Sequence, residues 1–246
     1  MTDKNIVDQQ YWNDSYVNYQ FAIADVNDPV RRFIAEHIPA VNRHATCIEI
    51  GCFPGRYLAV MGELGYELHG IDLTPRIDPD LRNWLNVCNY KVGEILNLGI
   101  ENLKLDQKHD VVCSFGFIEH FTNWESIIQK HLLLVADAGY LVITTPNFRG
   151  LVQRTFHQLV DEENLRRHVL ESMHPEKWVS LAKSLGFETI FAGHFGDFDF
   201  WVDNQERSKL QKLILKGINS TSQIFRKMPS NNAMYSPYCG MVLKKI

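Results

Sequence analysis

The sequence predicts an α/β fold in which parallel strands alternate with helices that cover both faces of one sheet. Short apolar runs alternate with amphipathic stretches along most of the chain, as expected for strands joined by crossover helices. The length of 246 residues, 45% of them hydrophobic, suits one domain with a sizeable core. The sequence contains no internal repeat and no linker-like tract, so we predict a single domain over residues 1–246.

Apolar runs mark the strands, and glycines mark where the intervening helices end. A helix is expected over residues 56–64 because Leu58, Met61 and Leu64 recur at helical spacing before Gly65. A second helix is expected over 176–184, before Gly186. The predicted strands are 46–50, 67–72, 110–114, 139–144, 187–195 and 234–243.

Three segments interrupt this alternation. Residues 1–42 are rich in aromatic side chains and lead into an amphipathic helix around 30–37, so we expect an N-terminal cap over the core. Residues 147–175 form a long insertion after a strand, with a polar centre at 161–164, and such long connections are often functional. Residues 204–234 are the third segment, expected to be a lid or an oligomer contact.

The third segment contains an amphipathic helix with a basic face. Its apolar residues Leu210, Leu213, Ile214 and Ile218 fall at helical spacing. One interpretation is a helix that packs on the core or on a partner in a homodimer, with a solvated basic side. The other is a lid that meets an anionic acceptor or the headgroups of a membrane, which would be a peripheral contact. The positive residues are Arg207, Lys209, Lys212, Lys216, Arg226 and Lys227, against the single acid Glu206.

Charge, hydropathy and cysteine content exclude several protein classes. The formal net charge of −4 disfavours a dedicated nucleic-acid binder. The first residues lack the basic and apolar regions of a signal peptide, and no apolar stretch is long enough for a transmembrane segment. The widely spaced cysteines show no CxxC pattern, so we expect reduced thiols in a cytoplasmic protein; they are Cys47, Cys52, Cys88, Cys113 and Cys239.

A glycine-rich turn follows the first strand and indicates a nucleoside site. Gly51 and Gly55 lie where this strand turns into a helix, so the backbone can turn tightly and approach a ligand. Asp72 follows Gly51 by 21 residues at the end of the next strand. From that position a carboxylate accepts hydrogen bonds from both hydroxyls of a ribose.

These features resemble the motifs of class I S-adenosylmethionine-dependent methyltransferases. A dinucleotide enzyme would show GxGxxG directly after the strand, whereas here Glu49 precedes Gly51 by two residues, as in the first methyltransferase motif. The resemblance implies a Rossmann-like sheet of seven strands, mostly parallel with an antiparallel last strand, and S-adenosyl-L-methionine as cofactor. Further motifs in the family's order are residues 65–72, 109–114, 118–121, 138–147 and 185–188.

The same resemblance assigns roles to individual residues. Gly51 and Gly55 would pass under the methionine part of the cofactor, and Asp72 would hold the ribose. Glu94 would face the adenine amino group with Ile95 on the ring, unless Glu94 is an ordinary loop carboxylate. Pro54 departs from the family pattern and removes one N–H from the loop. The other residues that the resemblance places at the cofactor are Glu49, Cys52, Phe53, Leu73 and Phe115, the last at the sulfonium end.

The chemistry requires alignment of an acceptor with the cofactor's methyl group, and a base where the acceptor is a hydroxyl. His120 is the leading candidate, with Glu119 beside it, although the pair could instead serve structure at the start of a helix. His174 is a further candidate, and His168 and His194 lie near it in sequence. The Glu–His pair resembles quinone O-methyltransferases, whose metal-dependent site uses another glutamate three residues upstream. Gly116 occupies that position here, so we predict no metal site.

The acceptor is predicted to be a small molecule or a glycan-linked hydroxyl. The aromatic stretch 195–201 suits a sugar ring or a flat organic molecule, and the insertion resembles methyltransferases of bacterial surface-glycan synthesis. We therefore expect an O-methyltransferase. The alternatives are an N-methyltransferase and a non-catalytic protein that keeps the fold and binds the cofactor.

Overall fold

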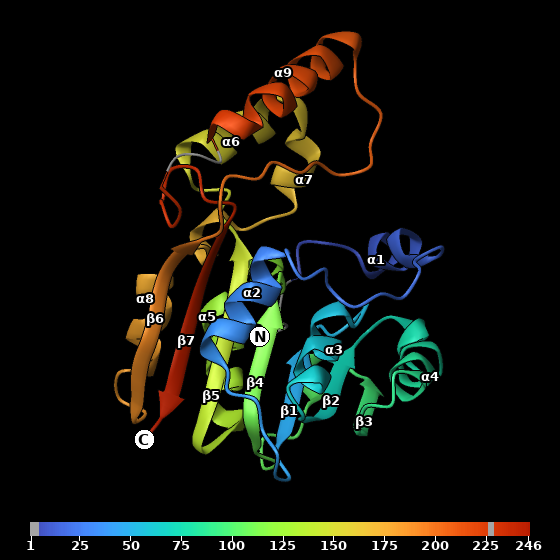
Figure 1. Cartoon of the computed structure of the whole chain (residues 1–246), viewed down its shortest axis with the longest axis vertical. Coiled ribbons are helices and arrows are strands. Elements are labelled where there is room, and N and C mark those ends of the chain that lie inside the picture. Colours follow the sequence, from blue (N-terminus) through green and yellow to red (C-terminus); the bar gives the residue numbers. More distant parts are fainter. Residues whose placement is uncertain (1–4, 226–228) are drawn as a thin grey trace.

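A single seven-stranded sheet forms the centre of the protein, as Figure 1 shows. The computed structural model describes residues 5–225 and 229–246. The strand order is β3-β2-β1-β4-β5-β7-β6, with β7 antiparallel to both of its neighbours and the other pairs parallel. This confirms the predicted fold class. The strands are β1 (Thr46–Ile50), β2 (Glu67–Asp72), β3 (Val92–Asn97), β4 (His109–Phe115), β5 (Val135–Pro146), β6 (Phe187–Phe195) and β7 (Tyr238–Lys245).

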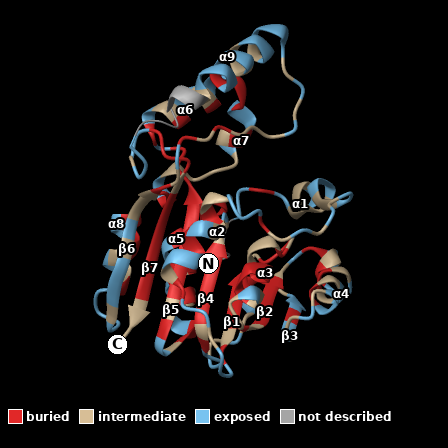
Figure 2. Ribbon diagram, in the orientation of Figure 1, coloured by how far each residue is buried: buried red, intermediate tan, exposed pale blue. Residues whose placement is uncertain are grey.

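Helices cover both faces of the sheet because the central strands are buried on both sides. Successive residues of β1 point to opposite faces, so Cys47 belongs to one apolar cluster and Ile48 to the other. The first cluster packs under α2, α3 and α4, and the second under α5 and α8. Figure 2 shows the central strands as buried. The helices are α1 (Gln9–Tyr16), α2 (Pro29–His37), α3 (Arg56–Glu63), α4 (Asp80–Val87), α5 (Trp124–Leu134), α6 (Leu151–Val160), α7 (Glu162–Arg166), α8 (Pro175–Ala182) and α9 (Lys209–Phe225).

The strand order reverses at β1, whose neighbours are β2 and β4. Loops after β1 and β4 therefore leave the carboxyl edge of the sheet in opposite directions and open a crevice between them, which is where ligands bind in open α/β sheets. The glycine-rich turn and the Glu119–His120 pair follow these two strands, so the topology brings the two predicted parts of the site together.

The long insertion and the basic helix form a layer beyond this edge, seen at the top of Figure 1. Helices α6 and α9 pack together through a small apolar cluster that includes Val160, Phe198 and Ile218. Asp161, fully buried between α6 and α7, anchors the layer: its side chain accepts hydrogen bonds from Arg207 and from Asn164 at 2.7 and 2.8 Å.

Several boundaries differ from the sequence prediction. The sequence did not predict β3 because it is an edge strand in which only Ile95 is buried, so it lacks an apolar run. The last strand begins at Tyr238 rather than residue 234, since the preceding residues form turns. Within the described residues, no helix is long and apolar enough to cross a membrane. The predicted basic residues Arg226 and Lys227 lie outside the described residues.

Candidate functional site

The turn after β1 needs glycine for two reasons: its backbone has positive φ angles, and neighbouring side chains leave no room for a Cβ atom. Gly51 and Gly55 have φ angles of +71° and +85°, in the left-handed region that disfavours other residues. A Cβ on Gly51 would lie 2.3 Å from the Phe117 ring, and one on Gly55 would lie 2.3 Å from Leu81. The turn is therefore held close to the loop after β4 and to α4, and larger residues at either glycine would displace it.

Asp72 ends β2 and faces this turn. Its carboxylate accepts hydrogen bonds from the backbone N–H of Thr74 at 2.9 Å and of Phe53 at 3.2 Å. Burial raises the pKa of Asp72 to about 6, although these backbone donors oppose the shift. The two bonds fix the carboxylate while each oxygen keeps capacity for another donor, which is the requirement for holding a ribose diol.

Glu49 lies next to Asp72 and is almost fully buried. Burial, and then the charge of Asp72, raise the pKa of Glu49 well above its usual value, while the Leu58 N–H in α3 opposes the shift. Its Oε2 atom has no hydrogen-bond partner among the described residues. Two acidic side chains side by side in a dry wall suit a ligand that carries positive charge.

A cavity of about 630 Å³ opens above the turn, a size typical of small-molecule and cofactor sites. Eight of the residues that were predicted to bind the cofactor line this cavity, namely Glu49, Gly51, Cys52, Phe53, Gly55, Asp72, Leu73 and Phe115. Its remaining walls come from the N-terminal cap and from the loops after β3 and β4, with Trp12, Tyr16, Leu98, Ile100, Glu101 and Phe117 among them.

Glu94 and Ile95 do not line this cavity in the described structure, so their contact with the adenine stays a prediction. Both lie within β3, where Glu94 is exposed and borders a separate small cavity below the site. The strand continues to Asn97, and the chain reaches the cofactor cavity only at residues 98–101. Glu101 is the acidic residue of that loop. The motif at residues 92–95 thus lies within β3, a polar edge strand that the sequence did not predict.

A second cavity, of about 340 Å³, adjoins the first. The two share wall residues Trp12, Tyr57, Phe115, Gly116 and His120. The second cavity extends toward the insertion and is lined by further aromatic and polar side chains. These include Tyr11, Glu119, Asn164, Arg167, His168, Trp201, Asp203 and Tyr238.

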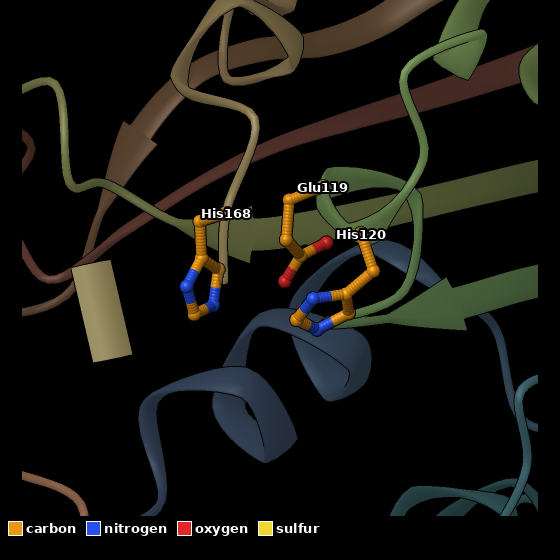
Figure 3. Close-up of side chains that lie close together, drawn as sticks. All are labelled: Glu119, His120 and His168. Atoms are coloured by element: carbon orange, nitrogen blue, oxygen red, sulfur yellow. The ribbon is translucent and has the colours of Figure 1, made fainter. Parts of the chain in front are cut away.

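Glu119, His120 and His168 lie together in the wall of the second cavity, as Figure 3 shows. Nδ1 of His120 lies 2.9 Å from the Arg167 carbonyl, and Nδ1 of His168 lies 2.7 Å from the Asn164 carbonyl. A carbonyl only accepts, so both Nδ1 atoms carry the proton and both Nε2 atoms carry a lone pair in the neutral ring. Burial lowers the pKa of His120 to about 4 and of His168 to about 3, and it raises the pKa of Glu119 to about 8.

The N-terminal cap completes this region and was missed as part of the site. The Trp12 ring packs edge-on against His120, with 4.9 Å between ring centroids. The Tyr11 hydroxyl donates to Asp203 at 2.9 Å, and the Arg167 guanidinium lies 4.5 Å from the centre of the Tyr11 ring. The aromatic richness of the N-terminus was the available signal, but sequence spacing could not indicate which ring reaches which loop.

The other predicted histidines lie elsewhere. His174 caps α8 and lies 2.6 Å from the Glu176 carboxylate, and His194 lies on β6. Among the described residues that line the two cavities, neither histidine occurs, so a catalytic role for His174 stays a prediction that the cavity linings do not support. The insertion contributes His168 instead.

Comparison with known proteins decides the family, because the profile of the methyltransferase domain matches residues 21–191, more than half of the chain. The chain belongs to this methyltransferase family. A curated relative, the ubiquinone biosynthesis O-methyltransferase of Rickettsia akari (strain Hartford), is 27% identical over 146 residues, which cover 57% of each chain. The match thus spans little more than half the length of that relative.

Solved methyltransferase structures share the fold. A S-adenosylmethionine-dependent methyltransferase from Archaeoglobus fulgidus is 22% identical, covering 88% of this chain and 93% of that one, with a TM-score of 0.55. The magnesium protoporphyrin IX methyltransferase of Synechocystis, solved with S-adenosylhomocysteine, is 11% identical, covering 97% and 95%, with a TM-score of 0.56. These likenesses show the fold, and the family profile shows that the chain is a methyltransferase domain.

Proposed function

We propose that this methyltransferase moves the methyl group of S-adenosylmethionine to a hydroxyl oxygen of a small molecule bound in the second cavity. The observation that carries the proposal is the shared wall between the two cavities, where His120 and Phe115 border both. A cofactor in the first cavity and an acceptor in the second would meet at this wall. In-line displacement requires that arrangement of nucleophile, methyl group and sulfur.

The cofactor would lie along the residues described above. Asp72 would accept the ribose hydroxyls, and the turn at Gly51 would pass close to the methionine part. Glu49 would add negative charge near the cationic cofactor, which supports binding in a dry site. The loop at residues 98–101, rather than Glu94 and Ile95, would contact the adenine.

The cluster around His120 favours a hydroxyl over an amine as acceptor. A hydroxyl is a weak nucleophile and must lose its proton as the methyl group moves, whereas a neutral amine needs no base. His120 is neutral and its tautomer is fixed by the Arg167 carbonyl, so Nε2 has a free lone pair in a ring that lines the cavity. Glu119 and His168 lie beside it and add further polar atoms where the proton must go.

The walls of the second cavity favour a flat and largely apolar acceptor. Trp12, Trp201, Tyr57 and Tyr238 supply aromatic faces, and the cavity's apolar surface exceeds its polar surface. The curated relative's name, a ubiquinone biosynthesis O-methyltransferase, supports a phenolic hydroxyl as the first class to test. A glycan-linked acceptor stays a prediction from sequence.

The test is methylation of matched panels of phenols, sugars and amines, with the product identified by mass spectrometry. We expect methylated phenols, and we expect His120→Ala to lower kcat about 10²-fold while the affinity for S-adenosylhomocysteine changes less than about twofold. His174→Ala is the matched control and should keep kcat, since that ring lies outside both cavities. Methylation of amines alone, or an unchanged kcat for His120→Ala, would contradict the proposal.

A further inference from the structure

We infer that Glu119, His120 and His168 bind a divalent transition-metal ion in the wall of the second cavity. The role assigned to this ion rests on the proposed function, but the binding itself does not. One ligand atom from each of the three residues lies within 4.8 Å of the other two. Glu119 and His120 come from the short turn after β4, and His168 comes from the insertion after α7, so two separate segments converge on one point (Figure 3).

The Glu119 carboxyl group has unmet bonding capacity. Its side chain is fully buried, and neither carboxyl oxygen has a hydrogen-bond partner in the described part of the chain. Leaving both oxygens without partners costs free energy, because the group loses its bonds to water and gains none in the protein. A metal ion at the centre of the cluster would supply the missing partner.

The two imidazoles are already oriented as metal ligands. Each ring directs its Nδ1–H to a backbone carbonyl, of Arg167 for His120 and of Asn164 for His168. Histidines that bind metals commonly have such a bond, because it fixes the tautomer and the ring orientation and leaves Nε2 for the ion. The ring centroids of His120 and His168 are 4.8 Å apart, so the two rings lie close enough together to bind one ion.

The surrounding charge permits a cation. The positive charge of Arg167 acts on both histidines, and its guanidinium is paired with Asp203. Asp203 also accepts the Tyr11 hydroxyl, which holds it in place. The pair carries no net charge, and Glu119 supplies one negative charge once it binds an ion.

The ligand set indicates the type of ion. Two nitrogens and one carboxylate suit Zn²⁺, Co²⁺, Mn²⁺ or Fe²⁺ better than Mg²⁺ or Ca²⁺, which prefer oxygen ligands. Bonds of about 2.0 to 2.2 Å place ligand atoms roughly 3.4 Å apart, so the three side chains would draw together on binding. Three protein ligands leave at least one position free toward the cavity.

That free position gives the ion a role in the proposed reaction. An acceptor hydroxyl bound to a divalent ion has a lower pKa, so it ionises near neutral pH. With His120 bound to the ion, the ion rather than the ring would activate the hydroxyl. The O–H bond would break, the proton would leave to solvent or buffer, and the oxygen would form its bond to the methyl carbon as the carbon–sulfur bond breaks. S-adenosylhomocysteine carries the electron pair of that broken bond.

The experiment uses the full chain after treatment with a chelator and removal of the chelator. We expect one Co²⁺ per chain, with visible absorption bands of cobalt bound by nitrogen and oxygen, and micromolar or tighter binding of Zn²⁺ by calorimetry. His168→Ala and Glu119→Gln should each weaken Zn²⁺ binding at least 30-fold. Glutamine has nearly the same shape as glutamate, so Glu119→Gln should keep the fold. Circular dichroism checks the folding of each variant.

His131→Ala is the matched control. His131 is also buried, and it too directs Nδ1 to the carbonyl four residues earlier, but it lies on α5 outside the cluster. It should keep Zn²⁺ binding within about twofold. Absence of one-to-one Co²⁺ binding, or equal weakening by His131→Ala and His168→Ala, would overturn the inference. If the protein methylates phenols but binds no metal, the metal inference is overturned and the proposed function stands. If it binds the metal but methylates no hydroxyl, the proposed function is overturned and the metal site stands.

Discussion

Asp72 combines two properties that oppose each other in the empty protein. Burial raises its pKa to about 6, so the side chain is protonated below that pH, while the proposed ribose contact requires an ionised acceptor. Cofactor binding must therefore release a proton at acidic pH. The affinity for the cofactor should therefore depend on pH, and Asp72 is the residue whose protonation causes this dependence.

We predict that the affinity for S-adenosylhomocysteine is constant above about pH 7 and falls by up to tenfold per pH unit below about pH 6. Asp72→Asn should weaken binding by roughly 1 to 3 kcal/mol at pH 7.5, because the charged acceptor is lost. Since Asn does not titrate, the variant should also show a flatter pH profile. Calorimetry between pH 5 and 8 measures both effects, and an equally steep profile in the variant would exclude Asp72 as the cause.

The residues of the glycine-rich turn could be predicted from sequence because their spacing is local. Gly51, Gly55 and Asp72 lie on one strand–helix–strand unit, whose geometry follows from the chain itself. The meeting of His120 with His168 could not be predicted, since it depends on how the insertion folds back. The prediction of no metal site considered only Gly116 and its neighbours in sequence, whereas the metal site inferred above adds His168 from another element.

At the scale of elements, α9 packs on α6 and exposes its basic face. Lys209, Lys212 and Lys216 are exposed, and within the described structure none of them lines either cavity. This geometry favours the first interpretation of the basic helix, a packed helix with a solvated side, over a lid on an anionic acceptor. Leu210 and Leu213 are also exposed, each at 67%, so the contact predicted with a membrane or a partner stays a prediction.

We predict that replacing Lys209, Lys212 and Lys216 together by glutamine changes the KM for a soluble acceptor by less than about twofold. Exposed charges far from a bound ligand are screened by salt, so they contribute little to its affinity. Steady-state kinetics at low and at physiological salt provide the measurement. A marked rise in KM that added salt reproduces in the original protein would restore the lid interpretation.

The elements that the sequence predicted well are the buried ones. Strands β1, β2 and β4 are mostly buried and were located within one residue of their observed bounds. The edge strand β3 and the cap helix α1 were missed, because exposed elements need no regular apolar pattern. The position of Glu94 within a strand was not expected because β3 was missed.

At the scale of the whole molecule, the cofactor cavity joins segments that are distant in sequence. Its walls come from the cap, from the turn after β1, and from the loops after β2, β3 and β4. A ligand in this cavity contacts all of them at once, so binding should stabilise the fold as a unit.

We predict that saturating S-adenosylhomocysteine raises the melting temperature. A ligand at 100 times its Kd adds about 2.7 kcal/mol to the free energy of unfolding. For a chain of this size, that corresponds to a rise of roughly 5 to 10 °C. Differential scanning calorimetry measures it, with Asp72→Asn as the variant expected to show a smaller rise. A nicotinamide dinucleotide that stabilises the protein equally would contradict the cofactor assignment.

The N-terminal helix α1 contributes to the walls of both cavities. Trp12 lines both cavities, and backbone bonds such as Ile6 N–H to the His120 carbonyl, at 2.8 Å, tie this segment to the loop after β4. One cover thus lies over both ligands. When it lifts, the methylated product and the spent cofactor lose their enclosure together, so exchange of both depends on a single opening rather than two independent gates.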